Sequence, residues 1–213
     1  MLEINKDIEK YILEHTSLED ELLRELTRIT HLKVLQPRML SGKIQGCILQ
    51  MFSKMISPKY ILEIGTFTGY SAICLAQGLT DEGVLHTIDI NDETLEIARE
   101  YISRSNVVGK IIIHEGNALT IIPQLNILFD FVFIDGDKRE YLEYYHTVFD
   151  KVAPGGFIFA DNVLWDGKIV KEIKHNDRYT KGIVEFNDFV VTDVRVECIL
   201  LPFRDGIMAI RKK

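Results

Sequence analysis

Two acidic clusters carry the residue types best suited to chemistry. Asp135-Gly136-Asp137-Lys138 follows the apolar run 129–134, and Asp161-Asn162 follows the apolar run 156–160. Both runs have the length and the β-branched or aromatic content of strands buried on both faces. Because open parallel sheets bind ligands outside the carboxyl ends of their strands, we expect the two clusters to meet at one sheet edge. Two carboxylates and an amide carbonyl suit Mg²⁺, Mn²⁺ or Ca²⁺ better than zinc, so the sequence predicts a divalent-metal site beside a lysine.

A glycine-rich turn, Glu63-Ile64-Gly65-Thr66-Phe67-Thr68-Gly69-Tyr70-Ser71, ends one expected strand and opens a helix. Glycines let a ligand approach the backbone, and the start of a helix offers free N–H groups. The Gly-x-x-x-Gly spacing departs from the dinucleotide pattern Gly-x-Gly-x-x-Gly. Asp89 ends the next expected strand, where an acidic residue binds the ribose hydroxyls of an adenosine cofactor. Together these features predict an adenosine ligand without a pyrophosphate.

The elements that must position these residues alternate between strand and helix from Tyr60 onward. Strands are expected at 60–64, 84–88, 111–114, 129–134 and 156–160, with helices at 71–79, 92–105, 119–125 and 139–152. Repeated βα units of this size predict a parallel, doubly wound sheet. A helix at 182–189 then leads to strands at 194–201 and 206–211, and the short turn between those strands predicts an antiparallel hairpin.

The N-terminal segment, residues 1–57, reads as helical. Thr16 or Ser17 can cap a helix whose apolar stripe contains Leu18, Leu22, Leu23 and Leu26. We expect this segment to pack on a single domain that spans residues 1–213 and to contribute to its site.

Composition places the chain among globular proteins of a reducing compartment. Its 213 residues are 46% hydrophobic, and its three cysteines are odd in number and widely spaced, which fits neither a disulfide framework nor a zinc site. No signal peptide or bilayer-spanning stretch is recognisable, so we expect a soluble, cytoplasmic protein with no membrane partner. A net charge of −7 does not suggest a general nucleic-acid binder.

These motifs, with Gly116-Asn117-Ala118, Tyr141, Gly155-Gly156 and the stretch from Asp161 to Trp165, resemble the cation-dependent O-methyltransferases of the caffeoyl-CoA and catechol type. They occur in order and cover most of the chain from Gln36 onward. The resemblance implies S-adenosylmethionine (SAM) as cofactor and a Rossmann-like class I methyltransferase fold. That fold is a seven-stranded, mostly parallel sheet that ends in an antiparallel hairpin, with helices on both faces. The resemblance also implies a homodimer and a metal that binds the vicinal hydroxyls of the substrate.

The family's site residues carry over position by position. The resemblance places the metal on Asp135, Asp161 and Asn162 and makes Lys138 the general base. It assigns the cofactor contacts to Met39, Ser41, Glu63, Gly65, Ser71, Asp89, Ala118, Asp135 and Asp137. A divalent cation stabilises the deprotonated form of a hydroxyl bound to it and disfavours the protonated form of a nearby lysine. The acceptor oxygen then attacks the sulfonium methyl in line, and most of the rate comes from alignment.

Structural roles compete with several of these assignments. Asp135 and Asp161 can be helix caps or turn residues, and Lys138 can be a solvated first-turn residue. Gly65 and Gly69 can serve a tight turn, and Asp89 can cap the helix expected near Asp92. Trp165 can pack near the mouth of the site or form an aromatic wall for a planar substrate. The histidines, including His86 and His114, show no ligand spacing and are interpreted as structural.

Three functions remain open from sequence. The first is methylation of a catechol-like or vicinal-diol small molecule, and the second is methylation of hydroxyuridine in tRNA, against which the acidic charge weighs. The third is a SAM-binding protein without catalysis, which would have no need of the metal-and-base set. The polar segment 165–180 is expected to lie over the site and set specificity; its basic residues, which can steer an anionic substrate, are Lys168, Lys171, Lys174, His175 and Arg178.

Overall fold

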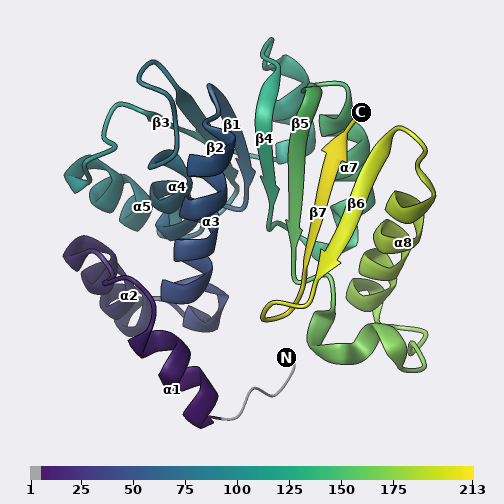
Figure 1. Ribbon diagram of the computed structural model, residues 1–213, viewed down its shortest axis with the longest axis horizontal. Coiled ribbons are helices and arrows are strands. Elements are labelled where there is room, and N and C mark those ends of the chain that lie inside the picture. Colours follow the sequence, from purple (N-terminus) through teal and green to yellow (C-terminus); the bar gives the residue numbers. More distant parts are fainter. Residues whose placement is uncertain (1–5) are drawn as a thin grey trace. The chain divides into compact units, whose positions relative to one another are not determined.

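In the computed structural model, which describes residues 6–213, seven strands form a sheet in the order β3-β2-β1-β4-β5-β7-β6 (Figure 1). The strands are β1 Tyr60–Ile64, β2 Val84–Asp89, β3 Ile111–Glu115, β4 Phe129–Ile134, β5 Val152–Asp161, β6 Val196–Leu201 and β7 Ile207–Lys212. The α-helices are α1 Lys6–Glu14, α2 Glu21–Lys33, α3 Gly42–Ile56, α4 Tyr70–Ala76, α5 Asp92–Arg104, α6 Ala118–Ile121, α7 Tyr141–Phe149 and α8 Arg178–Thr192. Short 3₁₀ segments are η1 Pro37–Met39, η2 Ile122–Gln124, η3 Lys138–Glu140 and η4 Trp165–Val170.

The directions of the strands confirm the predicted fold class. β2 and β3 pair in parallel, and so do β4 and β5, whereas β7 pairs antiparallel with both β5 and β6. Parallel neighbours need a crossover, and the helices between the strands supply it. The α/β fold with a mostly parallel sheet and a C-terminal antiparallel hairpin is therefore present.

By its contacts the chain divides into two compact units. The C-terminal unit comprises residues 62–65 and 118–213, and the N-terminal unit comprises residues 6–61 and 66–117 of the described chain. β1 passes from the N-terminal unit into the C-terminal unit. The single-domain boundary of 1–213 stays a prediction, and residues 1–5 of its N-terminal segment lie outside the described residues.

Aromatic residues build the core of the C-terminal unit. Phe131, Phe133, Tyr141, Tyr145 and Phe186 are fully buried. The ring of Tyr141 meets Phe186 of α8 edge to face with 5.6 Å between centroids. α7 packs against α8 and β4, and α8 lies beside β6 (Figure 1). Burial of each large apolar side chain contributes about 1.5–3 kcal/mol. This packing fixes α7, which begins after η3, the 3₁₀ segment that follows the acidic cluster at the end of β4.

The start of α2 corrects one prediction. Asp20, not Thr16 or Ser17, is the N-cap, and its carboxylate accepts a hydrogen bond from the N–H of Leu22 at 2.8 Å. The hydroxyl of Thr16 instead donates to the carbonyl of Ile12 at 2.6 Å, which ties it to α1. Leu18 therefore lies outside the helix and is 96% exposed, so it is not part of the buried stripe.

Other helix boundaries also differ from the predictions, and the helix expected at 71–79 is α4, which ends at Ala76. The helix expected at 139–152 begins as the 3₁₀ segment η3 and ends at Phe149, because Val152 already pairs with Phe129 in the sheet. The helix expected at 182–189 is longer, since Asp177 caps it and its side chain accepts from the N–H of Thr180.

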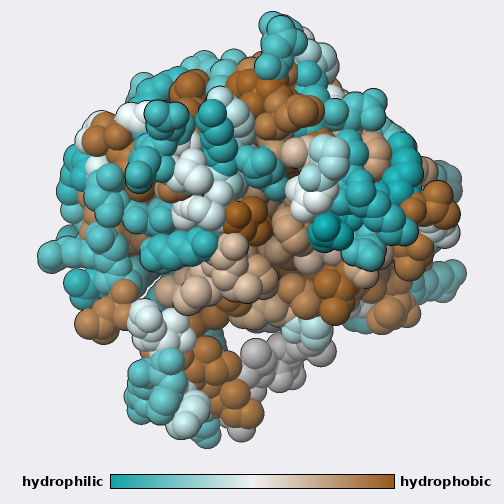
Figure 2. All heavy atoms as spheres, turned by 45° about the horizontal axis from the view of Figure 1, so that its top comes forward, coloured by the Kyte–Doolittle hydropathy of each residue, from teal (hydrophilic) through white to brown (hydrophobic). Residues whose placement is uncertain are grey.

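The surface mixes polar and apolar side chains. Figure 2 shows hydrophobic residues in several patches among hydrophilic ones on the face it presents. Within residues 6–213, no helix has both the length and the apolar character that a bilayer crossing requires.

Candidate active site

The carboxyl ends of β4 and β5 bring the two acidic clusters together, as the sequence predicts. Ile134 pairs with Ala160 in the parallel register, so Asp135 and Asp161 follow at the same level. Asp161 is only 3% exposed. Asn162 comes next with a left-handed φ of 59°, a conformation that asparagine tolerates, and its N–H donates to Asp161 Oδ1 at 2.8 Å. The three predicted metal ligands are thus neighbours at one edge of the C-terminal unit.

Lys138 is buried against this edge. Its Nζ donates to Asp135 Oδ1 at 2.5 Å and to the hydroxyl of Tyr141 at 2.6 Å. Only 8% of Lys138 is exposed, so the interpretation as a solvated first-turn residue is wrong. The side chain is an internal, hydrogen-bonded amine.

Tyr141 belongs to the site, although the motif that contains it predicted no role for it. Its hydroxyl oxygen lies 3.0 Å from the carbonyl oxygen of Asp161 and 3.3 Å from that of Ile134. Because the hydroxyl accepts from the ammonium of Lys138, its own proton is directed to one of these carbonyls. Tyr141 therefore ties Lys138 to the ends of both strands. The spacing Lys138-x-x-Tyr141 on a helical turn was the available signal.

The electrostatics of this edge favour a cation. Burial raises the pKa of Asp135; the ammonium of Lys138 opposes that shift, and the negative charge of Asp161 adds to it. Two carboxylates that repel each other in a buried place are stabilised by a bound cation. No cluster of three or more His, Cys, Asp or Glu side chains suited to a metal occurs in residues 6–213, so the expected set depends on the amide of Asn162 as third ligand. Its oxygen-only chemistry fits a hard divalent cation.

Gly65 has a packing role at the same edge. Its φ is +103°, and a Cβ atom there would lie 2.3 Å from the carbonyl oxygen of Asp135. The N–H of Asp135 donates to the carbonyl of Ile64 at 2.8 Å. The close approach of the two strand ends therefore requires glycine at position 65, whatever its part in cofactor binding.

Three further predicted cofactor residues belong to the C-terminal unit. Glu63 is completely buried in β1, and Ala118 is the buried first residue of α6. Asp137 caps η3, and its carboxylate accepts from the backbone N–H and the guanidinium of Arg139. Hydrogen bonds from Arg139 hold the pKa of Asp137 below its usual range. Asp137 is thus ionised and already paired.

Asp89 is fastened to the glycine-rich turn in the N-terminal unit. Its Oδ2 accepts from the N–H of Phe67 at 2.7 Å, and its Oδ1 accepts from the N–H of Asn91 at 3.1 Å. Asn91, not Asp89, caps α5. Asp89 therefore stabilises the turn, and the interpretation as a helix cap is wrong.

The remaining predicted cofactor residues also lie in the N-terminal unit. Ser71 is buried in the first turn of α4, and Ser41 is buried directly before α3. Met39 ends η1 and is 55% exposed.

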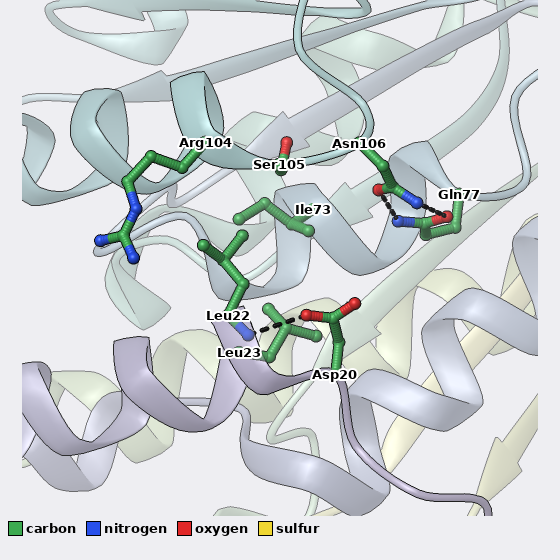
Figure 3. Close-up of a pocket in the computed structure, with 8 residues that line it drawn as sticks. All are labelled: Asp20, Leu22, Leu23, Ile73, Gln77, Arg104, Ser105 and Asn106. Atoms are coloured by element: carbon green, nitrogen blue, oxygen red, sulfur yellow. Dashed lines mark hydrogen bonds between the residues drawn. The ribbon is translucent and has the colours of Figure 1, made fainter.

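A cavity of about 230 Å³ in the N-terminal unit contains none of the predicted site residues (Figure 3). Asp20, Leu22, Leu23, Ile73, Gln77, Arg104, Ser105 and Asn106 line it. The amides of Gln77 and Asn106 hydrogen-bond each other at 2.6 Å, and Asp20 caps α2. Arg104 is bound to Glu25 at 2.6 Å. These polar groups serve the fold, so this cavity is not the candidate site.

The segment after Asn162 is held by the turn between β6 and β7. The N–H of Leu164 donates to the carbonyl of Asp205 at 2.8 Å, and the N–H of Asp166 donates to the carboxylate of Asp205 at 2.5 Å. Trp165 stacks on Tyr179, with 6.2 Å between ring centroids and 18° between ring planes. The basic residues Lys168, Lys171, Lys174, His175 and Arg178 are all exposed.

His86 and His114 pair with each other on neighbouring strands. Nδ1 of His86 lies 2.9 Å from Nε2 of His114, and the rings stack. This pairing agrees with their interpretation as structural residues.

Comparison with known proteins places the chain in a family. The family model for O-methyltransferase matches residues 13–213. A caffeoyl-CoA O-methyltransferase of Eucalyptus gunnii is 38% identical over 95% of this chain and 86% of its own length. The O-methyltransferase from Bacillus cereus in complex with S-adenosylhomocysteine (SAH) has a TM-score of 0.91 at 29% identity, with 97% of both chains covered. TomG from Streptomyces achromogenes in complex with SAM has a TM-score of 0.90 at 27% identity, over 97% of this chain and 96% of that one.

These solved structures share the Rossmann-like methyltransferase fold with this chain, and the expectation of an O-methyltransferase is confirmed. On the match of 201 consecutive positions, from residue 13 to residue 213, the chain belongs to the O-methyltransferase family of the caffeoyl-CoA type.

Proposed function

We propose that this protein transfers the methyl group of SAM to a hydroxyl of a catechol-like or vicinal-diol small molecule, with the help of a divalent cation. The observation that carries the proposal is the buried Lys138, which Asp135 and Tyr141 hold at the ends of β4 and β5. A buried amine paired with the carboxylate of Asp135 at the end of a strand suits proton transfer from an acceptor hydroxyl.

SAM as the methyl donor is supported by the relatives that bind SAM or SAH. It is also supported by the glycine-rich turn and by the half-buried carboxylate of Asp89, which two backbone N–H groups hold in place. An ordered carboxylate after the second strand of such a fold is suited to the ribose hydroxyls of an adenosine.

Asp135, Asp161 and Asn162 would hold the cation. When bound, a divalent cation lowers the pKa of an acceptor hydroxyl and offsets the charge of the two carboxylates. The residues of the chain do the rest. The neutral amine of Lys138 takes the proton of the acceptor hydroxyl on Nζ, and Tyr141 keeps that nitrogen at the strand ends. The acceptor oxygen then forms a bond to the methyl carbon as the bond from that carbon to sulfur breaks, in line.

The proposed acceptor class is supported by the relatives and by the charge of the segment that follows Asn162. The matched plant enzymes are named for caffeoyl-CoA, a catechol joined to an anionic carrier. Lys168, Lys171 and Lys174 are exposed around η4, and a cluster of cations suits an anionic acceptor. We propose a catechol that carries a negative group.

The test is transfer of labelled methyl from SAM to caffeic acid and to caffeoyl-CoA, with Mg²⁺ and again with EDTA. Undermodified tRNA serves as a parallel acceptor. Label in the catechol that disappears with EDTA supports the proposal. Label in tRNA alone moves the same chemistry to a nucleic-acid substrate, and label in none of the three, despite calorimetric binding of SAH, favours a binding protein without catalysis.

The homodimer remains a proposal that rests on the resemblance, and the cytoplasmic location remains one that rests on the number and spacing of the cysteines. Sedimentation equilibrium at micromolar concentration tests the first, since a dimer has twice the chain mass of 24.5 kDa.

A further inference from the structure

A continuous stack of side chains runs through the C-terminal unit from Asp137 to Lys168. The guanidinium of Arg139 hydrogen-bonds the Asp137 carboxylate, and its Nε lies 2.9 Å from Oδ1 and 3.0 Å from Oδ2. The same guanidinium lies over the ring of Tyr179, with Cζ 5.0 Å from the centroid. Tyr179 in turn stacks on Trp165, and Nζ of Lys168 lies 5.5 Å from the Trp165 centroid.

Stacking, rather than hydrogen bonding, holds the Trp165 ring. Its Nε1 is buried and has no hydrogen-bond partner among the described residues. The backbone around the ring is left-handed at three successive residues, with φ of 45° at Trp165, 55° at Asp166 and 68° at Gly167. Non-glycine residues adopt this conformation only when the surroundings enforce it. The position of the indole therefore depends on its neighbours in the stack.

The other end of the stack is rigidly placed. A Cβ atom on Gly182 would lie 2.5 Å from the carbonyl oxygen of Lys138, so the first turns of α8 sit directly on η3. Asp177 caps α8 through the N–H and the hydroxyl of Thr180. Tyr179, between these two anchors, is fixed opposite Arg139.

Asp137 is the point at which a ligand would enter this arrangement. Both of its oxygens are engaged by Arg139. An ammonium group that binds Asp137 must share the carboxylate with that guanidinium or displace it. Either event moves the guanidinium over Tyr179, whose ring attracts a cation placed over its face.

We infer that Arg139 and Tyr179 are positioning residues that couple occupancy of Asp137 by the cofactor's amino group to the placement of Trp165, three residues beyond Asn162. The inference rests on the proposed function, because it takes Asp137 as a cofactor contact. Binding of the cofactor then adjusts the aromatic side chain that follows the predicted metal ligands. Linkage makes this coupling reciprocal. If the cofactor changes the affinity for a second ligand that contacts Trp165 by some factor, that ligand changes the affinity for the cofactor by the same factor.

Trp165 is the chain's only tryptophan, so its fluorescence reports on the stack. SAH is titrated into the wild type and followed both by calorimetry and by fluorescence. We expect a fluorescence change whose midpoint equals the calorimetric Kd.

Tyr179→Leu and Arg139→Gln should lose the change while still binding SAH, whereas Tyr179→Phe, which keeps the ring, should retain it. Arg178→Gln is the matched control, because Arg178 is an exposed arginine beside Tyr179 and takes no part in the stack.

Arg139→Gln has a second expected effect. In this variant the amino group of SAH no longer competes with a guanidinium for the Asp137 carboxylate. SAH should therefore bind about two- to fivefold more tightly, a change in affinity that corresponds to the strength of a partly exposed ion pair. A merely structural role predicts weaker binding instead.

An unchanged wild-type fluorescence at saturating SAH overturns the inference, and so does a full response in Tyr179→Leu. Absence of calorimetric SAH binding to the wild type is a different result: it overturns the proposed function and the inference with it.

Discussion

Nζ of Lys138 lies 2.5 Å from Oδ1 of Asp135, in an ion pair of which only 9% of the lysine side chain and 21% of the aspartate side chain are exposed. Such a pair costs desolvation energy on both sides, and this cost is offset only when further hydrogen bonds complete the geometry. The hydroxyl of Tyr141 supplies one of them at 2.6 Å. The arrangement keeps an amine at the sheet edge where proton transfer is proposed.

Replacement of Lys138 by methionine tests its role as base. Turnover should fall by about 10²–10⁴-fold, the usual contribution of a positioned base, while SAH affinity measured by calorimetry stays within a factor of about two. Lys181→Met is the control, because Lys181 is 69% exposed on α8. Equal losses of turnover in both variants would contradict a specific role for Lys138.

Removal of the Tyr141 hydroxyl should cost both stability and activity. Tyr141→Phe leaves the Lys138 ammonium and the Asp161 carbonyl each with one hydrogen bond fewer in a buried place, so the free energy of unfolding should fall by about 1–3 kcal/mol. Urea unfolding and steady-state kinetics measure the two effects. Tyr144→Phe removes a phenol that bonds to Glu140 at 2.7 Å instead, and it should leave turnover within about twofold.

Divalent cations should stabilise the protein through the two carboxylates. A ligand at 100 times its Kd adds about 2.7 kcal/mol to the free energy of unfolding, so Mg²⁺ should raise the melting temperature of the wild type. Asp161→Ala should lose this shift together with turnover and keep SAH binding. In Asp188→Ala, which changes an exposed carboxylate on α8, the shift should persist. An Asp161→Ala protein with undiminished Mg²⁺ stabilisation and activity would exclude the metal mechanism.

Much of the fold was predictable, because the signals were local. The apolar run before Asp135 predicted β4, and the run before Asp161 predicted the second half of β5, which begins at Val152. Parallel topology then placed the carboxyl ends of the two strands side by side. The end of the helix at Phe149 was not predictable, since Val152 joins the sheet through its partner Phe129, 23 positions before it in the sequence. Helix periodicity contains no information on that pairing.

The site was predictable in its members but not in their connections. Residue types indicated Asp135, Lys138 and Asp161, whereas the link through the Tyr141 hydroxyl depends on where a helix places a phenol relative to two strand ends. The stack of Arg139 on Tyr179 joins residues 40 positions apart, which come together because α8 packs against η3, with Gly182 close to the Lys138 carbonyl. Such contacts are tertiary, and no sequence window contains them.

The histidine pair should make stability depend on pH. Burial lowers the pKa of both His86 and His114 below the ordinary value of 6.5, and their mutual charge adds to the shift at His86. The folded state therefore binds fewer protons than the unfolded chain below that pH. The contribution of the two histidines to the free energy of unfolding is complete above about pH 6.5. It is lost as the pH falls through their lowered pKa values in the folded state.

Urea unfolding at pH 7.5, 6.5 and 5.5 measures this dependence. His114→Asn should flatten it, because His86 then has no partner to repel its charge. His175→Asn, at an exposed position, should follow the wild type. A wild type whose free energy of unfolding is constant over this interval would show that the pair does not titrate on folding.

Gly65 and Gly109 offer a comparison that separates backbone strain from close contact. Both have positive φ, +103° and +86°, but a Cβ atom at position 109 would meet nothing within 4 Å, whereas one at position 65 would overlap the carbonyl oxygen of Asp135. Gly109→Ala should therefore cost only the strain of a left-handed residue, about 1–3 kcal/mol. Gly65→Ala adds a clash with backbone that no rotamer can relieve. Its loss in the free energy of unfolding, measured with urea, should therefore exceed that of Gly109→Ala by about 1–3 kcal/mol, the usual cost of overpacking.

Because the clash displaces the backbone of a predicted metal ligand, Mg²⁺ should also stabilise Gly65→Ala less than it stabilises Gly109→Ala. Equal losses in the two variants would mean that β1 and β4 separate at little cost, and that the approach of Gly65 to Asp135 does not position the site.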